Sequence, residues 1–289
     1  MYSDMGAPVH SAPLGGVGFS PDLLRKLSLA AAAVVFGVLI AAPRATHGFR
    51  QSPFESASSI PSNQIAELCR QGNPLDAIRL ADYELNRDGC SLPQLQQIHV
   101  LRAGAFRIMR RDTGAAADYA WAARYASGSG DTADVMPLRA LGWDPSSAFT
   151  LARKTLQNSN TDLWTLNAAC WTLAIYPGGD PALAARSISK AALASRNPAI
   201  IDTYAWSLYR SGQVEDAKLQ EMRALGEAQA ENDSLVSYLR ACLLGMRGDP
   251  VRAEMDLRTI FRQDVSFVDA WTVADRFGER PRASVTVAD

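Results

Sequence analysis

Residues 197–225 read NPAIIDTYAWSLYRSGQVEDAKLQEMRAL, and this stretch decides the fold class. The pair Asn197-Pro198 breaks any helix before it, because Pro cannot continue a helix that precedes it. Gly212 permits the positive φ that ends a helix, and a second helical pattern begins beyond it. The stretch therefore predicts two antiparallel helices joined by a tight turn.

The turn of this hairpin recurs along the chain as a short phrase. In the clearest copies a Gly is followed by Asp or Asn, then by Pro and, three residues later, by Ala. Asp or Asn caps the next helix, Pro loses no bond at its first position, and Ala lets two helices approach closely. A repeat of about 34 residues is typical of stacked helix hairpins. The copies begin at Gly72, Gly114, Trp143, Gly179, Gly212 and Gly248.

The first helices of two successive hairpins also resemble each other. Residues 166–173, LNAACWTL, align with residues 201–208, IDTYAWSL, at an offset of 35. Residues 197–225 resemble a tetratricopeptide repeat, although Ile201 stands where that family often has Trp and Glu221 where it usually has an aromatic residue. The matching positions are Ala205, Leu208, Gly212, Ala217 and Ala224.

This resemblance is good over residues 160–262 and diffuse over residues 63–158, where irregular helical packing is an alternative. It extends to tetratricopeptide-like segments of bacterial envelope proteins. It implies an all-α fold: a superhelical stack of antiparallel helix hairpins, or α-solenoid, whose concave face binds peptide or protein.

An apolar run from Leu27 to Ala42 follows Arg25 and Lys26 near the N-terminus. As a helix it would span roughly 24 Å, a little less than the bilayer core. An uncleaved membrane anchor is favoured over a signal peptide, because about 26 residues precede the run and Pro43 spoils the cleavage site. A buried core helix is the third alternative.

The anchor predicts a single-pass protein of the inner membrane with its large domain in the periplasm; cleavage would instead give a secreted or periplasmic protein. The predicted organisation is a disordered tail, a transmembrane or signal-anchor segment, a linker, the helical-repeat domain and a C-terminal tail. These segments are residues 1–22, 23–45, 46–62, 63–278 and 279–289.

Composition excludes several classes of function. Lys and Arg number 29 and Asp and Glu 30, so the chain lacks the basic footprint of a dedicated nucleic-acid binder. No metal-ligand spacing or catalytic motif is present, and we expect no metal site, no cofactor and no enzyme activity. His99 has no partner that the sequence identifies. A local basic patch could meet an acidic partner, anionic lipid headgroups or a nucleic acid, but a basic helix face whose charge acids elsewhere offset is the simpler interpretation. Its residues are Arg102, Arg107, Arg110 and Arg111.

Candidate partner-binding residues follow from the resemblance, which places the first helices on the concave face. On one of these helices Asp202, Trp206 and Tyr209 lie at i, i+4 and i+7 and share a face. Packing between repeats is an equal alternative for Trp171 and Trp206. The full predicted set is Asn167, Trp171, Asp202, Trp206 and Tyr209.

The sequence thus predicts a membrane-anchored adaptor that binds a protein partner in an envelope assembly or secretion complex. The alternative is a structural subunit of a larger membrane complex with no transient ligand. Both readings use residues 27–42 as the membrane contact, and neither identifies the partner.

Cys69 and Cys90 lie at the first helix of one predicted hairpin and just after its second helix. In an oxidising compartment a disulfide between them would contribute roughly 3 kcal/mol, whereas two unpaired thiols are the alternative. Cys170 and Cys242 lie in apolar helical contexts that indicate core positions. Mass analysis of native material without reductant should find Cys69 and Cys90 resistant to alkylation; two alkylated thiols would exclude the bridge.

Overall fold

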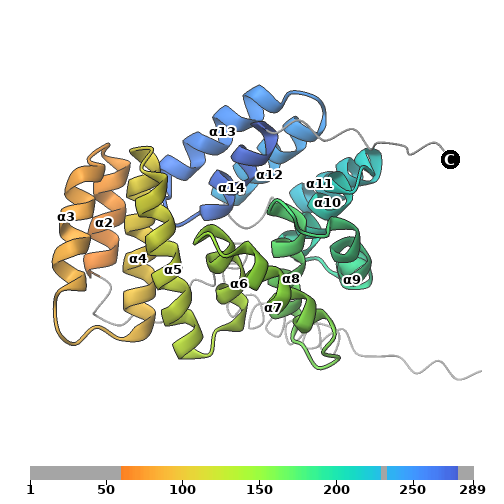
Figure 1. Ribbon diagram of the computed structural model, residues 1–289. Helices are drawn as coiled ribbons and strands as arrows, with labels where there is room; N and C mark the ends of the chain where they lie inside the picture. The colour runs from red at the N-terminus through yellow and green to blue at the C-terminus, as the bar shows by residue number, and fades with distance from the viewer. Residues whose placement is uncertain (1–59, 229–232, 279–289) are drawn as a thin grey trace, which may run out of the picture. The chain divides into compact units, whose positions relative to one another are not determined.

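The computed structural model describes residues 60–228 and 233–278, which form thirteen helices and no strand (Figure 1). They all belong to the compact unit Arg44–Asp289, one of two into which the chain divides. The prediction of an all-α fold is confirmed for these residues, and the helices are compatible with a helical-repeat fold. The predicted segments 1–22, 23–45 and 279–289 and nearly all of the linker 46–62 lie outside them.

The helices follow one another with short connections. They are α2 (Ile60–Arg70), α3 (Pro74–Leu85), α4 (Leu92–Ile108), α5 (Asp112–Ser129), α6 (Thr132–Leu141), α7 (Pro145–Leu156), α8 (Leu163–Ile175), α9 (Pro181–Ala194), α10 (Pro198–Arg210), α11 (Val214–Ala228), α12 (Asp233–Met246), α13 (Pro250–Gln263) and α14 (Val268–Gly278).

None of these helices is both long enough and apolar enough to cross a bilayer. That finding covers the described residues alone, and the predicted anchor at 27–42 lies outside them.

The recurring turn phrase marks helix boundaries. Four of its prolines are the first residues of α3, α7, α9 and α13. The carboxylates of Asp144, Asp180 and Asp249 each accept a backbone N–H in the first turn of the following helix. Gly72, Gly212 and Gly248 have positive φ, and Trp143 adopts φ 65° where the other copies have glycine. These local signals therefore define where one helix ends and the next begins.

Successive helices pack against each other as antiparallel neighbours along the chain. Small side chains lie at the contacts: Ala205 on α10 and Ala217 and Ala224 on α11 have no exposed surface. This close approach is the role that the sequence pattern predicts for the alanine of each hairpin.

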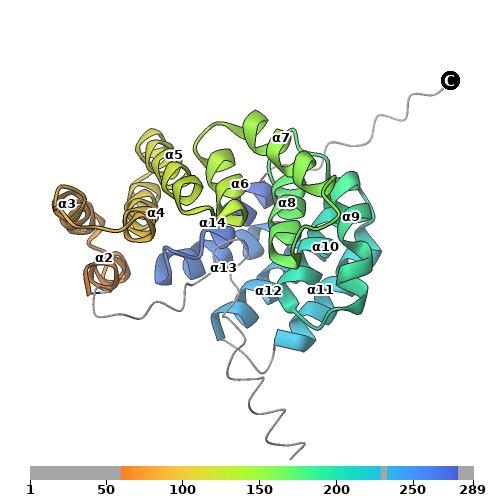
Figure 2. The ribbon, with the colours of Figure 1, turned by 90° about the horizontal axis from the view of Figure 1, so that it is seen from below.

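The C-terminal helices depart from a simple linear stack, because they return to helices much earlier in the chain (Figure 2). α13 contacts α2, and α14 contacts α8 as well as α12 and α13. Gly104 of α4 approaches the loop before α14 so closely that an added Cβ would lie 2.9 Å from the Cβ of Val265. Early and late parts of the domain are thus joined through the segment that contains α14.

Helix α14 is amphipathic, and its apolar side is buried. Ala270, Val273 and Ala274 have no exposed surface, and Phe277 is 8% exposed, whereas Trp271, Asp275 and Arg276 are partly exposed. The Phe277 ring lies 5.0 Å from the ring of Trp206 on α10. An apolar stripe of this kind packs against the core, so α14 contributes one face to the interior of the domain.

Glycine substitutions test the contact between α12 and α14. A Cβ at Gly245 would lie 2.3 Å from Cζ of Phe277, so Gly245→Ala should lower the free energy of unfolding by roughly 1–3 kcal/mol. Gly226 on α11 has nothing within 4 Å of an added Cβ, and Gly226→Ala should raise it by up to roughly 1 kcal/mol. Urea unfolding of both variants measures these changes. Effects of the same sign would contradict the close contact at Gly245.

Candidate functional site

The predicted groove residues are mostly core residues. Asn167, Trp171, Asp202 and Trp206 have no exposed surface, whereas Tyr209 is partly exposed. The expectation that these four side chains line an open concave face is therefore corrected, and the packing alternative describes Trp171 and Trp206. Whether the chain binds a protein partner is a separate question.

The physical reason for this burial is packing by several neighbouring helices. The Phe277 ring of α14 contacts Trp206 at 5.0 Å and Tyr209 at 6.1 Å between ring centroids. Helix α8, which carries Asn167 and Trp171, packs mainly against α6, α7, α9 and α10. Other helices of the same chain thus cover the side chains that the resemblance assigns to a ligand.

The structure brings Asp202 together with groups that the sequence analysis did not connect to it. One ligand atom each from Asp202 on α10, Glu221 on α11 and Cys242 on α12 lie within 4.8 Å of one another, and all three residues are buried. The hydroxyl of Tyr238 donates to Oδ2 of Asp202 at 3.4 Å. Three successive helices therefore meet in a buried polar cluster, defined by Asp202, Glu221, Tyr238 and Cys242.

Burial decides the protonation state of this cluster. Burial raises the pKa of Glu221 well above its ordinary value, and the negative charge of Asp202 and a hydrogen bond to Asp202 raise it further. Burial and the charges of Glu221 and Asp202 also raise the pKa of the Cys242 thiol. We interpret the acid pair as a neutral Glu221 carboxyl that donates to the Asp202 carboxylate.

Carboxylate and thiolate groups at this spacing are possible ligands of a divalent cation. A cation would have to displace protons from Glu221 and Cys242, whose raised pKa values favour the protonated forms. The acid pair is therefore the better description, and the predicted lack of a metal site stays a prediction.

All four cysteines are free in the structure. Cys69 is buried, which raises the pKa of its thiol to about 11, and the Sγ of Cys90 contacts the carbonyl oxygen of Glu84 at 3.7 Å. The predicted Cys69–Cys90 disulfide is not formed in this arrangement. Cys170 and Cys242 have no exposed surface, as the apolar patterns around them predict.

His99 and Arg102 belong to one ion-pair network on α3, α4 and α5, and Arg107 of the basic patch forms a separate ion pair. His99 Nδ1 lies 2.8 Å from Oδ1 of Asp118, and Arg102 Nε donates to Oδ2 of the same carboxylate at 2.9 Å. Arg102 also pairs with Asp82. Arg107 pairs with Asp112 and lies over the Trp271 ring, 5.5 Å from its centroid. Two of the four arginines are thus neutralised by acids of the chain itself.

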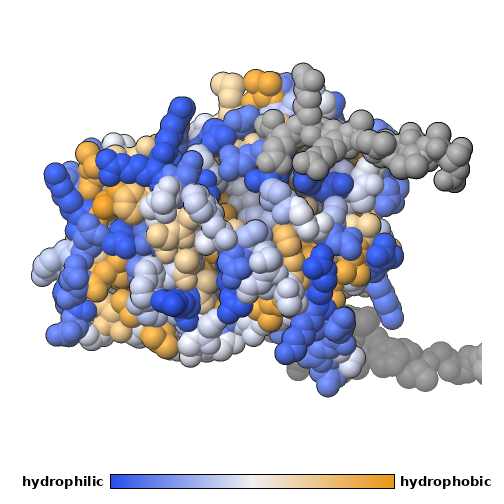
Figure 3. Space-filling view, viewed as in Figure 1, coloured by the Kyte–Doolittle hydropathy of each residue, from blue (hydrophilic) through white to orange (hydrophobic). Residues whose placement is uncertain are grey.

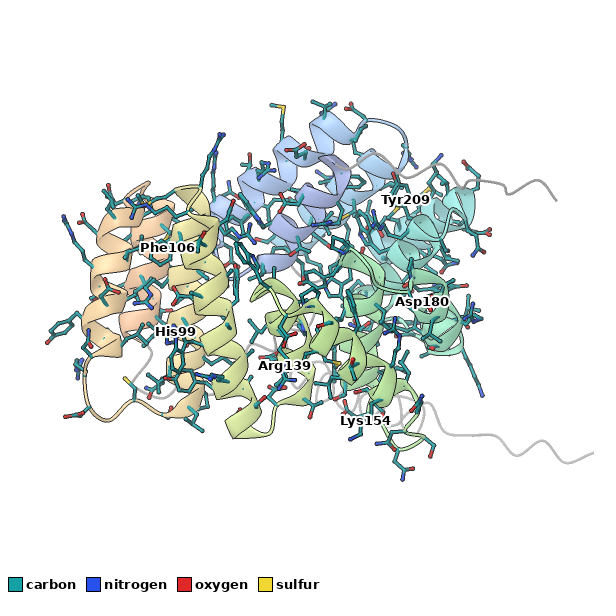
Figure 4. The ribbon with its side chains drawn as sticks, in the orientation of Figure 1. His99, Phe106, Arg139, Lys154, Asp180 and Tyr209 are labelled. Atoms are coloured by element: carbon teal, nitrogen blue, oxygen red, sulfur yellow. The ribbon has the colours of Figure 1, made fainter. Side chains whose placement is uncertain are left out.

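A partly exposed aromatic face lies beside this network, over the buried His99 that Figure 4 labels. The rings of Trp121 and Tyr125 stack with His99 at 6.2 Å and 5.6 Å and with each other at 6.1 Å. The Arg124 guanidinium lies 4.8 Å from the Trp121 ring centroid, and Trp121 remains 45% exposed. We define the aromatic face as His99, Trp121, Arg124 and Tyr125.

Trp121, Arg124 and Tyr125 belong to no motif that the sequence patterns mark. Trp121 and Tyr125 lie at i and i+4 on one helix face, and Asp118 lies at i−3 from Trp121, so the spacing carried a signal. What the sequence could not show is that α4 places His99 and Arg102 opposite these positions.

A comparison of the chain with protein-family models finds no matching family. A comparison with curated proteins finds no matching sequence either. The resemblance to tetratricopeptide repeats therefore depends on the sequence motifs of residues 160–262, and the function has to be argued from the structure's own geometry.

The acid pair predicts a pH dependence of stability. Because the folded pKa of Glu221 is raised, the native state holds a proton that the unfolded chain releases. Stability from this group is complete below the ordinary glutamate pKa and is lost as pH rises towards the folded pKa, at up to roughly one kcal/mol per pH unit.

Glu221→Gln keeps a donor to Asp202 but removes this titration, so its stability should fall less with rising pH than that of the parent chain. The exposed Glu215, on the same helix, provides the matched control Glu215→Gln. Urea unfolding from pH 5 to pH 9 measures the slopes. Parallel curves for the parent chain and Glu221→Gln would show that no proton is held there.

Proposed function

We propose that the chain is a helical scaffold that binds another protein through the aromatic face of α4 and α5. The observation that carries this proposal is Trp121, a large aromatic side chain that is 45% exposed yet packed by His99, Tyr125 and Arg124. Trp, Tyr and Arg are the residues most enriched among the strongest contacts of protein interfaces.

The contacts beneath the aromatic face favour binding because they order its side chains in advance. Less side-chain conformational entropy is then lost when a partner binds. His99 is held by the Asp118 carboxylate, which two nitrogens of Arg102 also contact at 2.6 Å and 2.9 Å. Rings that are already ordered lose little freedom when a partner covers them. A partner with an apolar or acidic patch would fit, since the Arg124 guanidinium borders the Trp121 ring.

The sequence supports the cellular location and the adaptor role that we propose for this scaffold. The apolar run 27–42 supports anchoring in the inner membrane, and the tetratricopeptide-like motifs support a role as an adaptor in an envelope assembly or secretion complex. In this proposal the N-terminal segment holds the scaffold at the membrane and the helical domain presents the aromatic face to its partner.

A second candidate is a structural subunit that is permanently buried in a membrane complex. Exposed apolar side chains on α11 and α13 favour it: Leu219, Met222, Val251 and Met255 are between 42% and 69% exposed. Figure 3 shows apolar surface, in orange, along the upper edge over α13. Permanent burial of such side chains would remove them from water, and here the partner surface would be α11 and α13 rather than α4 and α5.

Two exposed tryptophans distinguish these candidates. Trp121→Ala should lower affinity for the partner by roughly 2 kcal/mol, about thirtyfold, because it removes the central ring of the aromatic face. Trp143→Ala is the matched control, since Trp143 is 65% exposed and contacts no ring among the described residues. Quantitative co-purification of the full chain from its native host, after crosslinking, measures partner recovery.

The scaffold proposal expects that partner recovery is lost with Trp121→Ala and kept with Trp143→Ala, while both variants melt close to the parent chain. Unchanged recovery with Trp121→Ala would overturn it. Retention of a fixed-stoichiometry complex with Trp121→Ala, but its loss with Met255→Lys, would favour the structural subunit instead.

A further inference from the structure

A shallow surface hollow of about 410 Å³, wide open to solvent, lies between α6 and α7, on helices distinct from those of the aromatic face. Arg139 contributes from α6 and Lys154 from the last turn of α7, and Figure 4 labels both side chains. Three hydroxyl groups and one leucine complete the lining. We call this the basic hollow; its lining residues are Arg139, Ser146, Ser147, Thr150, Leu151 and Lys154.

The two cations of the basic hollow are not neutralised by carboxylates. Neither Arg139 nor Lys154 takes part in an ion pair with another described residue, whereas Arg102, Arg107 and Arg258 all do. Arg139 Nη1 donates to the hydroxyl of Ser147 at 3.0 Å, which fixes the guanidinium at the wall and leaves its other donors available. Two cations and several hydroxyls without an acid in the lining suit an oxyanion.

Two carboxylates lie close by and act against an anion: Asp144 at the start of α7, and Asp162, which lines the adjoining hollow together with Lys154. Asp144 caps α7 by accepting the backbone N–H of Ser147 at 3.2 Å, and the Ser146 hydroxyl donates to the same oxygen at 3.3 Å. The helix N-terminus is therefore already occupied by the chain's own anion. Attraction for a ligand has to come from the side chains of Arg139 and Lys154.

A second hollow of about 320 Å³ adjoins the first, since Leu151 and Lys154 line both. Its other lining groups are mainly hydroxyls and amides at the end of α7 and in the α7–α8 loop, and we call it the polar hollow. Side chains of this kind hydrogen-bond hydroxyl groups. They are Thr132, Thr155, Asn158, Asn160, Thr161, Asp162 and Thr165.

We propose that the two hollows together bind a phosphate ester of a small polyol. The phosphate lies between Arg139 and Lys154 in the basic hollow, and the polyol hydroxyls contact the asparagine and threonine side chains of the polar hollow. A soluble ester such as glycerol 3-phosphate and the headgroup of a glycerophospholipid share this chemistry. The proposal goes beyond the scaffold function and does not depend on it, because no residue of the aromatic face lines either hollow.

Titration calorimetry of the full chain with glycerol 3-phosphate at constant ionic strength tests the proposal. Lys154→Gln and Arg139→Gln should each weaken binding about tenfold, as expected when a charge-assisted contact to the phosphate is lost. Arg153→Gln is the matched control, because Arg153 is exposed on the same helix and lines neither hollow. Lys154 is exposed and its ammonium group has no hydrogen bond or ion pair to another described residue, so its variant remains informative if Arg139→Gln disturbs the Ser147 contact.

Asp144→Asn provides a test in the opposite direction. Asn caps helices as well as Asp does, so the variant should fold normally, and removal of the nearby negative charge should tighten binding about threefold. The polyol part is tested by inorganic phosphate and by glycerol, which should bind more weakly than the ester. Equal losses with Lys154→Gln and Arg153→Gln, or no binding of the ester by the parent chain at 10 mM, would overturn the proposal.

Vesicles distinguish the two sources of the ligand. The parent chain and Lys154→Gln share the same N-terminal segment, so a difference between them reports the hollow alone. A lipid headgroup predicts that Lys154→Gln weakens binding to phosphatidylglycerol vesicles but not to phosphatidylcholine vesicles. A soluble ester predicts that the two proteins bind both vesicles equally while the calorimetric difference persists.

Discussion

The contact between Phe277 and the rings and backbone around it holds the domain together. Phe277 lies 5.0 Å from Trp206 and 6.1 Å from Tyr209, and Gly245 has no side chain because the Phe277 ring fills that space. Through this one helix, α10 and α12 are joined to the end of the chain, and the loop before it reaches α4 at Gly104. A row of hairpins that would otherwise touch only its neighbours thereby acquires a shared core.

This packing changes where function can lie. In a stack of hairpins with a free inner face, the first helices offer a groove to a ligand, whereas here neighbouring helices bury the corresponding side chains of α8 and α10, and α14 covers Trp206. The polar groups left inside, Asp202, Glu221 and Cys242, have side-chain atoms within 4.8 Å of one another, and their burial raises the pKa values of Glu221 and Cys242. Among the described residues, the surfaces that we propose to meet other molecules are the aromatic face of α4 and α5 and the hollows beside α7, with the exposed apolar side chains of α11 and α13 as the alternative.

Local signals in the sequence predicted the helix boundaries well, because a cap and its turn act within a few residues. Asp144, Asp180 and Asp249 cap the helices that the turn phrase predicts. The environments of the candidate site residues are harder to predict, because they depend on residues that are distant in the sequence. Whether Trp206 lies in a groove or in the core depends on Phe277, and His99 gains a role only through Asp118 on the next helix.

The central position of α14 also bears on the order of folding. Helix α14 is the last described helix to leave the ribosome, yet Trp206 and Tyr209 on α10 depend on it for cover. Hairpins near the N-terminus can form early from local contacts, but the shared core closes only after synthesis of Phe277. During translation the nascent chain therefore carries an unfilled apolar surface, and the folding intermediate most exposed to aggregation is the one that lacks this last helix.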